Sequence, residues 1–399
     1  MTPQDATLAF CRRYGFNLNY LHGPDRYTVA GAADDFDGRV NSIAILRNGR
    51  FGNIVLQLLH ASMLARQLRI EQIYGFTFQG GPNAGTIETP GLRFCFADGR
   101  TDAAPKPTLV GEFFNSYAFQ SALSGLHADF VADTISTCLL PLFADRLASA
   151  EGDAQEAVLH FRSGDIFDAP PTSIWYVQPP AAFYVSAFRN LRERGYVRRA
   201  RLVFEDRRNP AVDAVEAALR AEGVPVALTD GTFDADLSAL VGARHIVSSF
   251  STFTEAAALL SPRLVTYSAF RSLESHAHLH EHRPVPLFEA QLRLRSVRMF
   301  LFRDTDDSFI APLDWRNTQE QRHAIVTFNA ELLTLTEMAS PVMTGERALL
   351  ANTTDEALNL RNALVAEQAR TLQRWNFPSR LVRWWRSRGQ RHKASRSFS

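Results

Sequence analysis

The feature that most constrains the fold is a repeated alternation of strand-length apolar runs and helix-length segments in the second half of the chain. Strands separated by helices of this length form right-handed βαβ crossovers, which build a parallel sheet. The alternation therefore predicts an α/β domain of the Rossmann type. The expected strands lie at 158–160, 201–204, 224–228, 245–247 and 263–267, and the expected helices between them at 179–194, 211–222, 234–241 and 253–260.

A second unit of the same kind lies near the N-terminus. Residues 42–46 are expected to form a buried strand, Arg47–Asn53 a tight loop, and Ile54–Leu68 a helix that Asn53 would cap. The loop matches neither the GxGxxG fingerprint nor the phosphate-binding P-loop, so it predicts a Rossmann-like half-domain without identifying a ligand. The alternative is that its glycines serve only the turn.

The length of the chain, 399 residues, is large for a single hydrophobic core. The acidic, small-residue segment 148–154 is the best candidate for a domain junction, and a further helix is expected at about 354–375. We therefore predict two Rossmann-like α/β domains with parallel sheets, followed by a partly helical extension and a basic, Trp-rich tail. The expected bounds of these four parts are 1–152, 153–285, 286–373 and 374–399.

The composition excludes several classes of protein. Forty-three basic residues stand against 42 acidic ones, so no chain-wide charge attracts nucleic acid. Cys11, Cys95 and Cys138 have no metal-ligand spacing, and we expect them to be reduced and mostly buried. The N-terminus has no signal-peptide pattern, and no run approaches the roughly 20 apolar residues of a membrane-spanning helix. These features predict a cytoplasmic protein without a zinc site.

Three of the expected strands end in polar residues. Carboxyl ends of parallel strands meet at one edge of a sheet, which is where open α/β sheets bind their ligands. The polar residues at these three ends are His160, Arg162 and Asp165, then Glu205 and Asp206, and finally Ser249, Ser251 and Thr252.

The third strand end predicts an anion site. Thr252 and Glu255 have the spacing of a capping box at a helix start. A helix N-terminus offers free N–H groups and a partial positive charge, and Arg162 could hold the same anion with two parallel hydrogen bonds. Together these residues predict a pyrophosphate site. The alternative is a capping box with no ligand, which would explain the residue types by itself.

Five short segments occur in the order and spacing of one known family over about residues 42–268. They are Arg47–Asn53, Gly111–Ser116, His160–Asp165, Leu202–Asp206 and Ala243–Phe253. They are similar, in that order, to the GRLGN, GYFQS, HxRRGD, S-D-D and C-x-H-x-I-x-S-N-S-T-F segments of α1,2-fucosyltransferases and the wider α1,6- and protein O-fucosyltransferase superfamily.

The resemblance implies a GT-B fold, with an acceptor domain at 1–152 and a nucleotide-sugar domain at 153–285. It implies inverting transfer of a sugar, fucose from GDP-fucose, to a hydroxyl of a glycan or lipid-linked glycan in surface-polysaccharide assembly. Arg162 would contact the β-phosphate of the donor. No cofactor is expected, and the lack of a D-x-D motif at a strand end fits metal independence. The expected catalytic residues are Arg162, Asp165, Glu205 and Asp206. The last three are candidates by position for the base that deprotonates the acceptor hydroxyl, the sequence does not single one out, and Asp165 could equally orient Arg162. The expected donor-binding residues are His160, Arg162, Ser249, Ser251, Thr252, Glu255, Arg50, Gly52 and Asn53.

The sequence departs from the family pattern at three places. Ser163 replaces the second arginine of HxRR, Glu205-Asp206 replaces the acidic pair, and Thr254-Glu255 replaces the tryptophans that usually follow S-T-F. Two alternatives therefore stay open. The protein could use another nucleotide sugar, or it could bind a sugar nucleotide without catalysing transfer.

Two C-terminal segments lie beyond the resemblance. Histidines alternate with other residues from His276 to His282, which would put four on one face of an extended chain. A solvated edge or an acceptor-facing loop is favoured over a metal site. A metal site also needs an enclosing geometry and supporting residues around the ligands, and the sequence shows no sign of either.

The tail 374–399 has several cations, three tryptophans and no carboxylate. This composition favours peripheral binding to an anionic membrane surface on its inner face. Nucleic-acid stacking and a tail without function are the alternatives.

Overall fold

The computed structural model describes residues 1–14, 27–47, 49–97, 104–113, 128–150, 152–168, 177–229, 231–271, 292, 295–306, 309–310 and 315–338. The chain divides into two compact units, Met1–Ala351 and Asn352–Ser399, and every described residue belongs to the first. The predicted helix at 354–375, the histidine run 276–282 and the tail 374–399 lie outside the described residues. Within the described ranges, every helix is too short or too polar to cross a bilayer.

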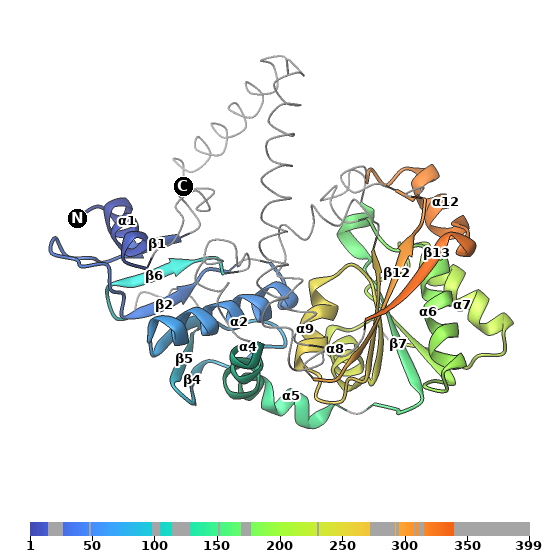
Figure 1. The fold of residues 1–399 in the computed structure, drawn as a ribbon, viewed down its shortest axis with the longest axis horizontal. Coiled ribbons are helices and arrows are strands. Elements are labelled where there is room, and N and C mark those ends of the chain that lie inside the picture. The colour runs from blue at the N-terminus through green and yellow to red at the C-terminus, as the bar shows by residue number, and fades with distance from the viewer. Residues whose placement is uncertain are drawn as a thin grey trace, which may run out of the picture. The chain divides into compact units, whose positions relative to one another are not determined.

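The first unit contains two sheets (Figure 1). The first sheet has six strands in the order β1-β6-β2-β3-β5-β4. The four central strands are parallel, and the edge strands β1 and β4 are antiparallel to their neighbours. The strands are β1 (Tyr27–Ala30), β2 (Ser42–Ile45), β3 (Gln72–Phe76), β4 (Gly85–Thr89), β5 (Leu92–Ala97) and β6 (Thr108–Gly111).

The second sheet has seven strands in the order β13-β12-β11-β10-β7-β8-β9. Six of them are parallel, and only the edge strand β13 is antiparallel to its neighbour. The sheet continues past residue 285, because β12 and β13 come from the following segment. The strands are β7 (Glu156–Phe161), β8 (Arg199–Phe204), β9 (Val226–Leu228), β10 (His245–Ser248), β11 (Thr266–Arg271), β12 (Arg298–Asp304) and β13 (Leu333–Met338).

The order of the parallel strands is that of a Rossmann fold. Numbered along the chain, the six parallel strands of the second sheet follow the order 3-2-1-4-5-6 from β9 to β12. The strand order therefore reverses between β7 and β10. The parallel strands of the first sheet reverse in the same way between β2 and β6. In such sheets the ligand binds outside the carboxyl ends of the strands at the reversal.

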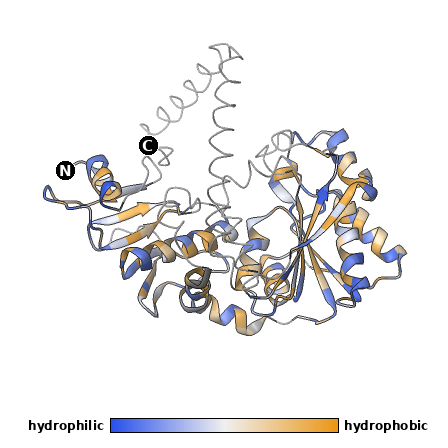
Figure 2. Ribbon diagram, viewed as in Figure 1, coloured by the Kyte–Doolittle hydropathy of each residue, from blue (hydrophilic) through white to orange (hydrophobic). Residues whose placement is uncertain are grey.

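Helices cover the sheets through apolar faces. One hydrophobic core runs from the first sheet under α2 to α8 and α9, and the other lies between the second sheet and α6, α7 and α12. Figure 2 shows largely hydrophobic strands beside helices that carry hydrophilic segments. The helices are α1 (Pro3–Tyr14), α2 (Phe51–Leu68), α4 (Ala128–Thr134), α5 (Ala144–Ser149), α6 (Ala181–Glu193), α7 (Ala211–Ala221), α8 (Phe233–Gly242), α9 (Thr252–Leu260) and α12 (Gln319–Thr327), with short π or 3₁₀ turns η3 (Ile135–Leu139), η4 (Leu140–Phe143), η5 (Gly164–Phe167) and η6 (Ala330–Leu332).

Two Rossmann-like sheets in one chain form the GT-B-like architecture that the sequence predicts, so the predicted fold of this part of the chain is confirmed. The strand and helix alternation of the second sheet is also confirmed, with β11 starting three residues later than expected at Thr266. The predicted start of α2 is wrong. The helix begins at Phe51 with Arg50 as its N-cap residue, so Asn53 lies inside the first turn and does not cap the helix.

Candidate active site

A cavity of about 700 Å³ opens at the carboxyl ends of the parallel strands. It lies at the strand-order reversal of the second sheet, since loops after β7 and β10 both line it, and the loop after β2 of the first sheet faces them. Its size suits a ligand of nucleotide dimensions. Nine residues named from the sequence as site residues line it: Arg50, Gly52, Asn53, His160, Arg162, Asp165, Glu205, Ser251 and Thr252.

Three other predicted site residues, all within the described ranges, lie outside the cavity lining. They are Ser249, Asp206 and Glu255. Ser249 contacts the lining residue His160, because its Oγ lies 2.7 Å from the Nδ1 of that histidine. Sequence position alone could not separate these residues from the lining, since all three directly follow strands or helix starts whose neighbours do face the cavity.

The N-terminus of α9 points its first turn at the cavity. Ser251 is the N-cap residue, and its Oγ accepts a hydrogen bond of 3.2 Å from the backbone N–H of Phe253. The predicted capping box at Thr252 and Glu255 is therefore wrong, because the cap lies one residue earlier. Thr252 instead uses its hydroxyl to donate a 2.7 Å hydrogen bond to the Oδ1 of Asn53 in α2.

The first turns of α2 and α9 meet at Gly52. A Cβ atom at this position would lie 2.4 Å from the backbone carbon and oxygen of Thr252 and 2.5 Å from the nitrogen of Phe253. Only a glycine allows the two backbones to approach this closely. Together with the bond between Asn53 and Thr252, this contact fixes the first-sheet wall of the cavity against the second-sheet wall.

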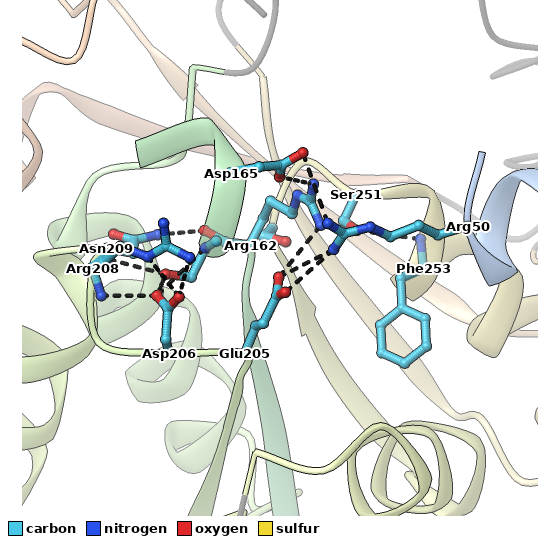
Figure 3. Close-up of polar contacts among 12 residues, drawn as sticks. Arg50, Arg162, Asp165, Glu205, Asp206, Arg208, Asn209, Ser251 and Phe253 are labelled. Atoms are coloured by element: carbon cyan, nitrogen blue, oxygen red, sulfur yellow. Dashed lines mark hydrogen bonds and ion pairs between the residues drawn. The ribbon is translucent and has the colours of Figure 1, made fainter. Parts of the chain in front are cut away.

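Four charged side chains from both walls form a ring in the cavity, which we call the charge ring (Figure 3). Arg162 Nη2 donates a 2.6 Å hydrogen bond to Asp165 Oδ1, and Arg50 Nη1 lies 3.3 Å from both carboxylate oxygens of Glu205. Two longer ion pairs close the ring, from Arg50 to Asp165 at 3.8 Å and from Arg162 to Glu205 at 3.9 Å. The ring has no net formal charge, because two guanidinium groups alternate with two carboxylates.

The turn that carries Arg162 and Asp165 allows the carboxylate of Glu205 to come close. Gly164 has φ +72, a conformation that side chains rarely adopt, and a Cβ there would lie 2.4 Å from Glu205 Oε2. The glycine therefore lets the Glu205 carboxylate reach the turn. Trp315 holds the other side of the turn, since its indole Nε1 donates a 2.8 Å hydrogen bond to the carbonyl of Ile166.

Ser163, which stands where the fucosyltransferase segment that this turn resembles has a second arginine, is part of the same turn. It is only 1% exposed, its Oγ donates to Asp206, and it accepts a 3.1 Å hydrogen bond from the backbone N–H of Asn209. A longer side chain at this buried position would displace these hydrogen bonds. A guanidinium beside that of Arg162 comes instead from Arg50, across the cleft, since both arginines contact Asp165.

The carboxylate of Asp206 is held by hydrogen bonds within the turn. Burial alone would raise its pKa, but hydrogen bonds from the side chain of Arg208, from Ser163 and from the backbone N–H groups of Arg208 and Gly164 together lower the pKa of Asp206 to about 2. Its carboxylate lies in a network with Arg208 on one side of the turn, as Figure 3 shows. Of the two acidic residues after β8, Glu205 faces the cavity and Asp206 does not.

His160 is a buried neutral histidine. Its Nδ1 lies between the hydroxyls of Ser249 and Thr254, at 2.7 and 2.8 Å, and thereby ties β7 to α9. Burial, with a smaller contribution from the charge of Arg162, lowers the pKa of His160 to about 3. The ring can accept or donate hydrogen bonds but carries no charge at neutral pH.

We expect this histidine to make the protein acid-sensitive. An unfolded chain takes up a proton on the histidine near pH 6.5, whereas the folded protein resists protonation until about pH 3. The free energy of unfolding should therefore fall by about 1.4 kcal/mol per pH unit as the pH drops below 6.5. His245, whose pKa burial lowers to about 4, should add a similar slope. Urea unfolding between pH 6.5 and 5 measures this.

Replacement of His160 by asparagine should remove about half of that slope. The exposed His323 offers a matched control, since His323→Asn changes one histidine outside the core and should leave the slope unchanged. An equal slope in wild type and His160→Asn would contradict the buried neutral state.

Sequence reasoning missed the aromatic part of the cavity. Six phenylalanines line it, from both walls, and Phe51 packs against four aromatic rings at centroid distances of 5.5 to 6.1 Å. Arg47 and the buried Asp236 line it as well. Phe51 and Phe253 lie inside segments that were recognised, but Phe233 and Asp236 follow β9 in a stretch with no motif. The six lining phenylalanines are Phe51, Phe78, Phe161, Phe233, Phe250 and Phe253.

In the ranges that the structure describes, no three His, Cys, Asp or Glu side chains are grouped as metal ligands. No family model matches the sequence, and no curated protein is significantly similar to it. Among solved structures, the chain is similar to POFUT1 in complex with GDP, with a TM-score of 0.33 and 11% identity over 57% of this chain and 97% of that one. It is also similar to E. coli ADP-heptose lps heptosyltransferase II, with a TM-score of 0.32 and 12% identity over 72% of this chain and 98% of the other. At these values neither similarity assigns an activity or a substrate.

Proposed function

We propose that this protein is an inverting glycosyltransferase that transfers fucose from GDP-fucose to a hydroxyl of a glycan acceptor in surface-polysaccharide assembly. The main support is one observation: Arg162 and the N-terminus of α9 flank the strand-order reversal of a Rossmann-type sheet, and both line a cavity of about 700 Å³. This is where such sheets bind nucleotides. The sequence resemblance to fucosyltransferases supports the donor, and the two-sheet architecture fits it.

The chemistry follows from the groups that line the cavity. When a sugar leaves a nucleoside diphosphate, negative charge develops on the β-phosphate. Arg162 and Arg50 would hold that phosphate with charge-assisted hydrogen bonds, and the first backbone N–H groups of α9 would add a partial positive charge. Fixed donors of this kind stabilise the leaving group without a cofactor. In the proposal Ser251, Thr252, Gly52 and Asn53 shape this phosphate site.

The two walls would have different tasks. The second-sheet wall supplies Arg162 and the N-terminus of α9 to the phosphate site, and the rings of Phe233, Phe250 and Phe253, whose faces suit a planar base. The first-sheet wall supplies Arg47, Phe78 and Gln79, and would receive the acceptor. The acceptor hydroxyl would attack the anomeric carbon from the side opposite the diphosphate, which inverts its configuration.

A thermal-shift panel of GDP, UDP, CMP and ADP tests the nucleotide assignment. A ligand that binds only the folded protein adds about 2.7 kcal/mol of stability at a concentration 100 times its dissociation constant. We expect GDP to raise the melting temperature the most. Stabilisation by UDP alone would rule out GDP-fucose as donor, and no response to any nucleotide would overturn the proposal.

Two alternative functions are tested by the same panel together with an assay of GDP-fucose turnover. If another nucleotide stabilises the protein, it uses a different nucleotide sugar. If GDP binds but neither hydrolysis of GDP-fucose nor transfer is measurable, the protein binds a sugar nucleotide without catalysis, which the loss of the second arginine at Ser163 would explain.

A membrane role for the tail 374–399 stays part of the proposal. Its cations and three tryptophans, without carboxylates, support peripheral binding to an anionic leaflet on the cytoplasmic side, close to lipid-linked acceptors. Sedimentation with anionic and neutral liposomes compares the full chain with a chain that ends at residue 373. Deletion should abolish binding to the anionic liposomes, and unchanged binding would reject the role.

A further inference from the structure

The charge ring occupies the space in which the diphosphate is proposed to bind. Arg50 and Arg162 are both neutralised by Asp165 and Glu205 at 2.6 to 3.9 Å. A diphosphate carries at least two negative charges, and two carboxylates at contact distance would repel it. The donor can therefore use both guanidinium groups only if at least one carboxylate gives up its arginines.

Glu205 is the carboxylate that can move away from the two arginines. Its contacts to Arg50 are 3.3 Å and its contact to Arg162 is 3.9 Å, whereas Asp165 holds Arg162 at 2.6 Å. The Glu205 side chain is also the more exposed of the two, at 47% against 34% for Asp165. Asp165 lies three residues from Arg162 in the same turn and keeps that guanidinium oriented.

We propose that Glu205 is the base that deprotonates the acceptor hydroxyl, and that Arg50 and Arg162 hold it inactive until the donor diphosphate takes both guanidinium groups. This inference rests on the proposed function. A carboxylate that loses its cations is a better proton acceptor than one inside an ion pair. The exchange makes the base available only when donor is present, so donor binds before acceptor.

The reaction balances with the groups present. The acceptor oxygen forms a bond to the anomeric carbon while the bond from that carbon to the β-phosphate oxygen breaks. The electron pair of the broken bond goes to the diphosphate, which Arg50 and Arg162 hold. The hydroxyl proton goes to Glu205, which returns it to water after the product leaves and then binds its arginines again. With water in place of the acceptor, the same steps hydrolyse the donor.

The variant Glu205→Gln separates this role from a structural one. It removes the competing charge but keeps the shape of the side chain. We expect inorganic pyrophosphate and GDP to bind about three- to fivefold more tightly than to the wild type, measured by isothermal titration calorimetry. Hydrolysis of GDP-fucose should at the same time become at least about 100-fold slower, the usual cost of losing a general base. Tighter binding with lost turnover is not expected from a residue that only supports the fold.

Glu222→Gln is the matched control. Glu222 is also paired with two arginines, Arg189 and Arg192, but it lies outside the cavity lining. Its variant should leave both binding and hydrolysis unchanged. Asp165→Asn should instead weaken pyrophosphate binding, because Arg162 loses the partner that orients it.

The results distinguish this inference from the proposed function. If the wild type binds GDP and hydrolyses GDP-fucose but Glu205→Gln binds no tighter, or hydrolyses at the wild-type rate, the role of Glu205 is wrong and the proposed function stands. If the wild type binds neither pyrophosphate nor any nucleotide, the proposed function is wrong, and the inference falls with it.

Discussion

Replacement of Arg162 by alanine is expected to weaken GDP binding by about 100-fold or more and to abolish measurable transfer. Hydrogen bonds to charged groups contribute about 1.5 to 3 kcal/mol each, and a guanidinium can make two of them to one phosphate. The variant also leaves Asp165 without its 2.6 Å partner, next to an anionic ligand. Calorimetric titration with GDP and an assay of GDP-fucose turnover measure the two effects.

Two variants sharpen this test. Arg162→Lys keeps the charge but loses the fork of parallel donors, so it should bind with intermediate affinity. Arg192→Ala removes an arginine that is paired with Glu222 outside the cavity and should bind GDP like the wild type. The fold should survive in Arg162→Ala, because the backbone carbonyl of residue 162 still accepts its hydrogen bond from Asn209. Wild-type affinity in Arg162→Ala would remove the phosphate site from the proposal.

Replacement of Gly52 by alanine is expected to lower the free energy of unfolding by about 2 to 3 kcal/mol, because overpacking a tight contact costs about this much. The new methyl group would meet the backbone of Thr252 at 2.4 Å, and backbone cannot move aside as a flexible side chain can. The higher helix propensity of alanine has the opposite effect, because by itself it would raise the free energy of unfolding by about 1 kcal/mol. Urea unfolding measures the difference, and GDP binding should weaken in parallel as Asn53 and Thr252 separate.

Gly223→Ala provides the comparison for this variant. No atom lies within 4 Å of a Cβ at Gly223, whose φ is +73. Alanine there should cost only the strain of its backbone conformation, about 1 kcal/mol. GDP affinity should not change in this control. Equal stabilities and equal GDP affinities in the two variants would show that the junction between α2 and α9 does not hold the cavity together.

Five strands of the second sheet, β7 to β11, could be predicted from the sequence because their signals are local. Each is a short apolar run, and each from β7 to β10 is followed by a helix with regular apolar spacing. The edge strands β1 and β4 could not be predicted in this way. The pairing of β1 depends on partners far along the chain, such as Gly111 for Tyr27. β4 pairs with the neighbouring strand β5, but it is largely exposed, so its residues show no burial pattern.

The site could be predicted only in part, for a related reason. Arg162, Asp165 and Glu205 follow strands directly, and the parallel order brings them to one edge. The sequence could not show that Arg50 would pair with Glu205, because 155 residues separate them. Glu205 and Asp206 are neighbours in the sequence, but only Glu205 faces the cavity. Asp206 points away because it accepts a hydrogen bond from Ser163, a contact that the sequence does not show.

The contact between Gly52 and Thr252 limits how the two halves of such a protein can be recombined. A chimera would join the first-sheet half of one protein to the second-sheet half of another. In this chain residues 50–53 contact residues 251–254 through a close backbone approach and a hydrogen bond between side chains, and Arg50 crosses the cleft to Glu205. A chimera must therefore take both segments from the same parent, and its crossover points belong outside them.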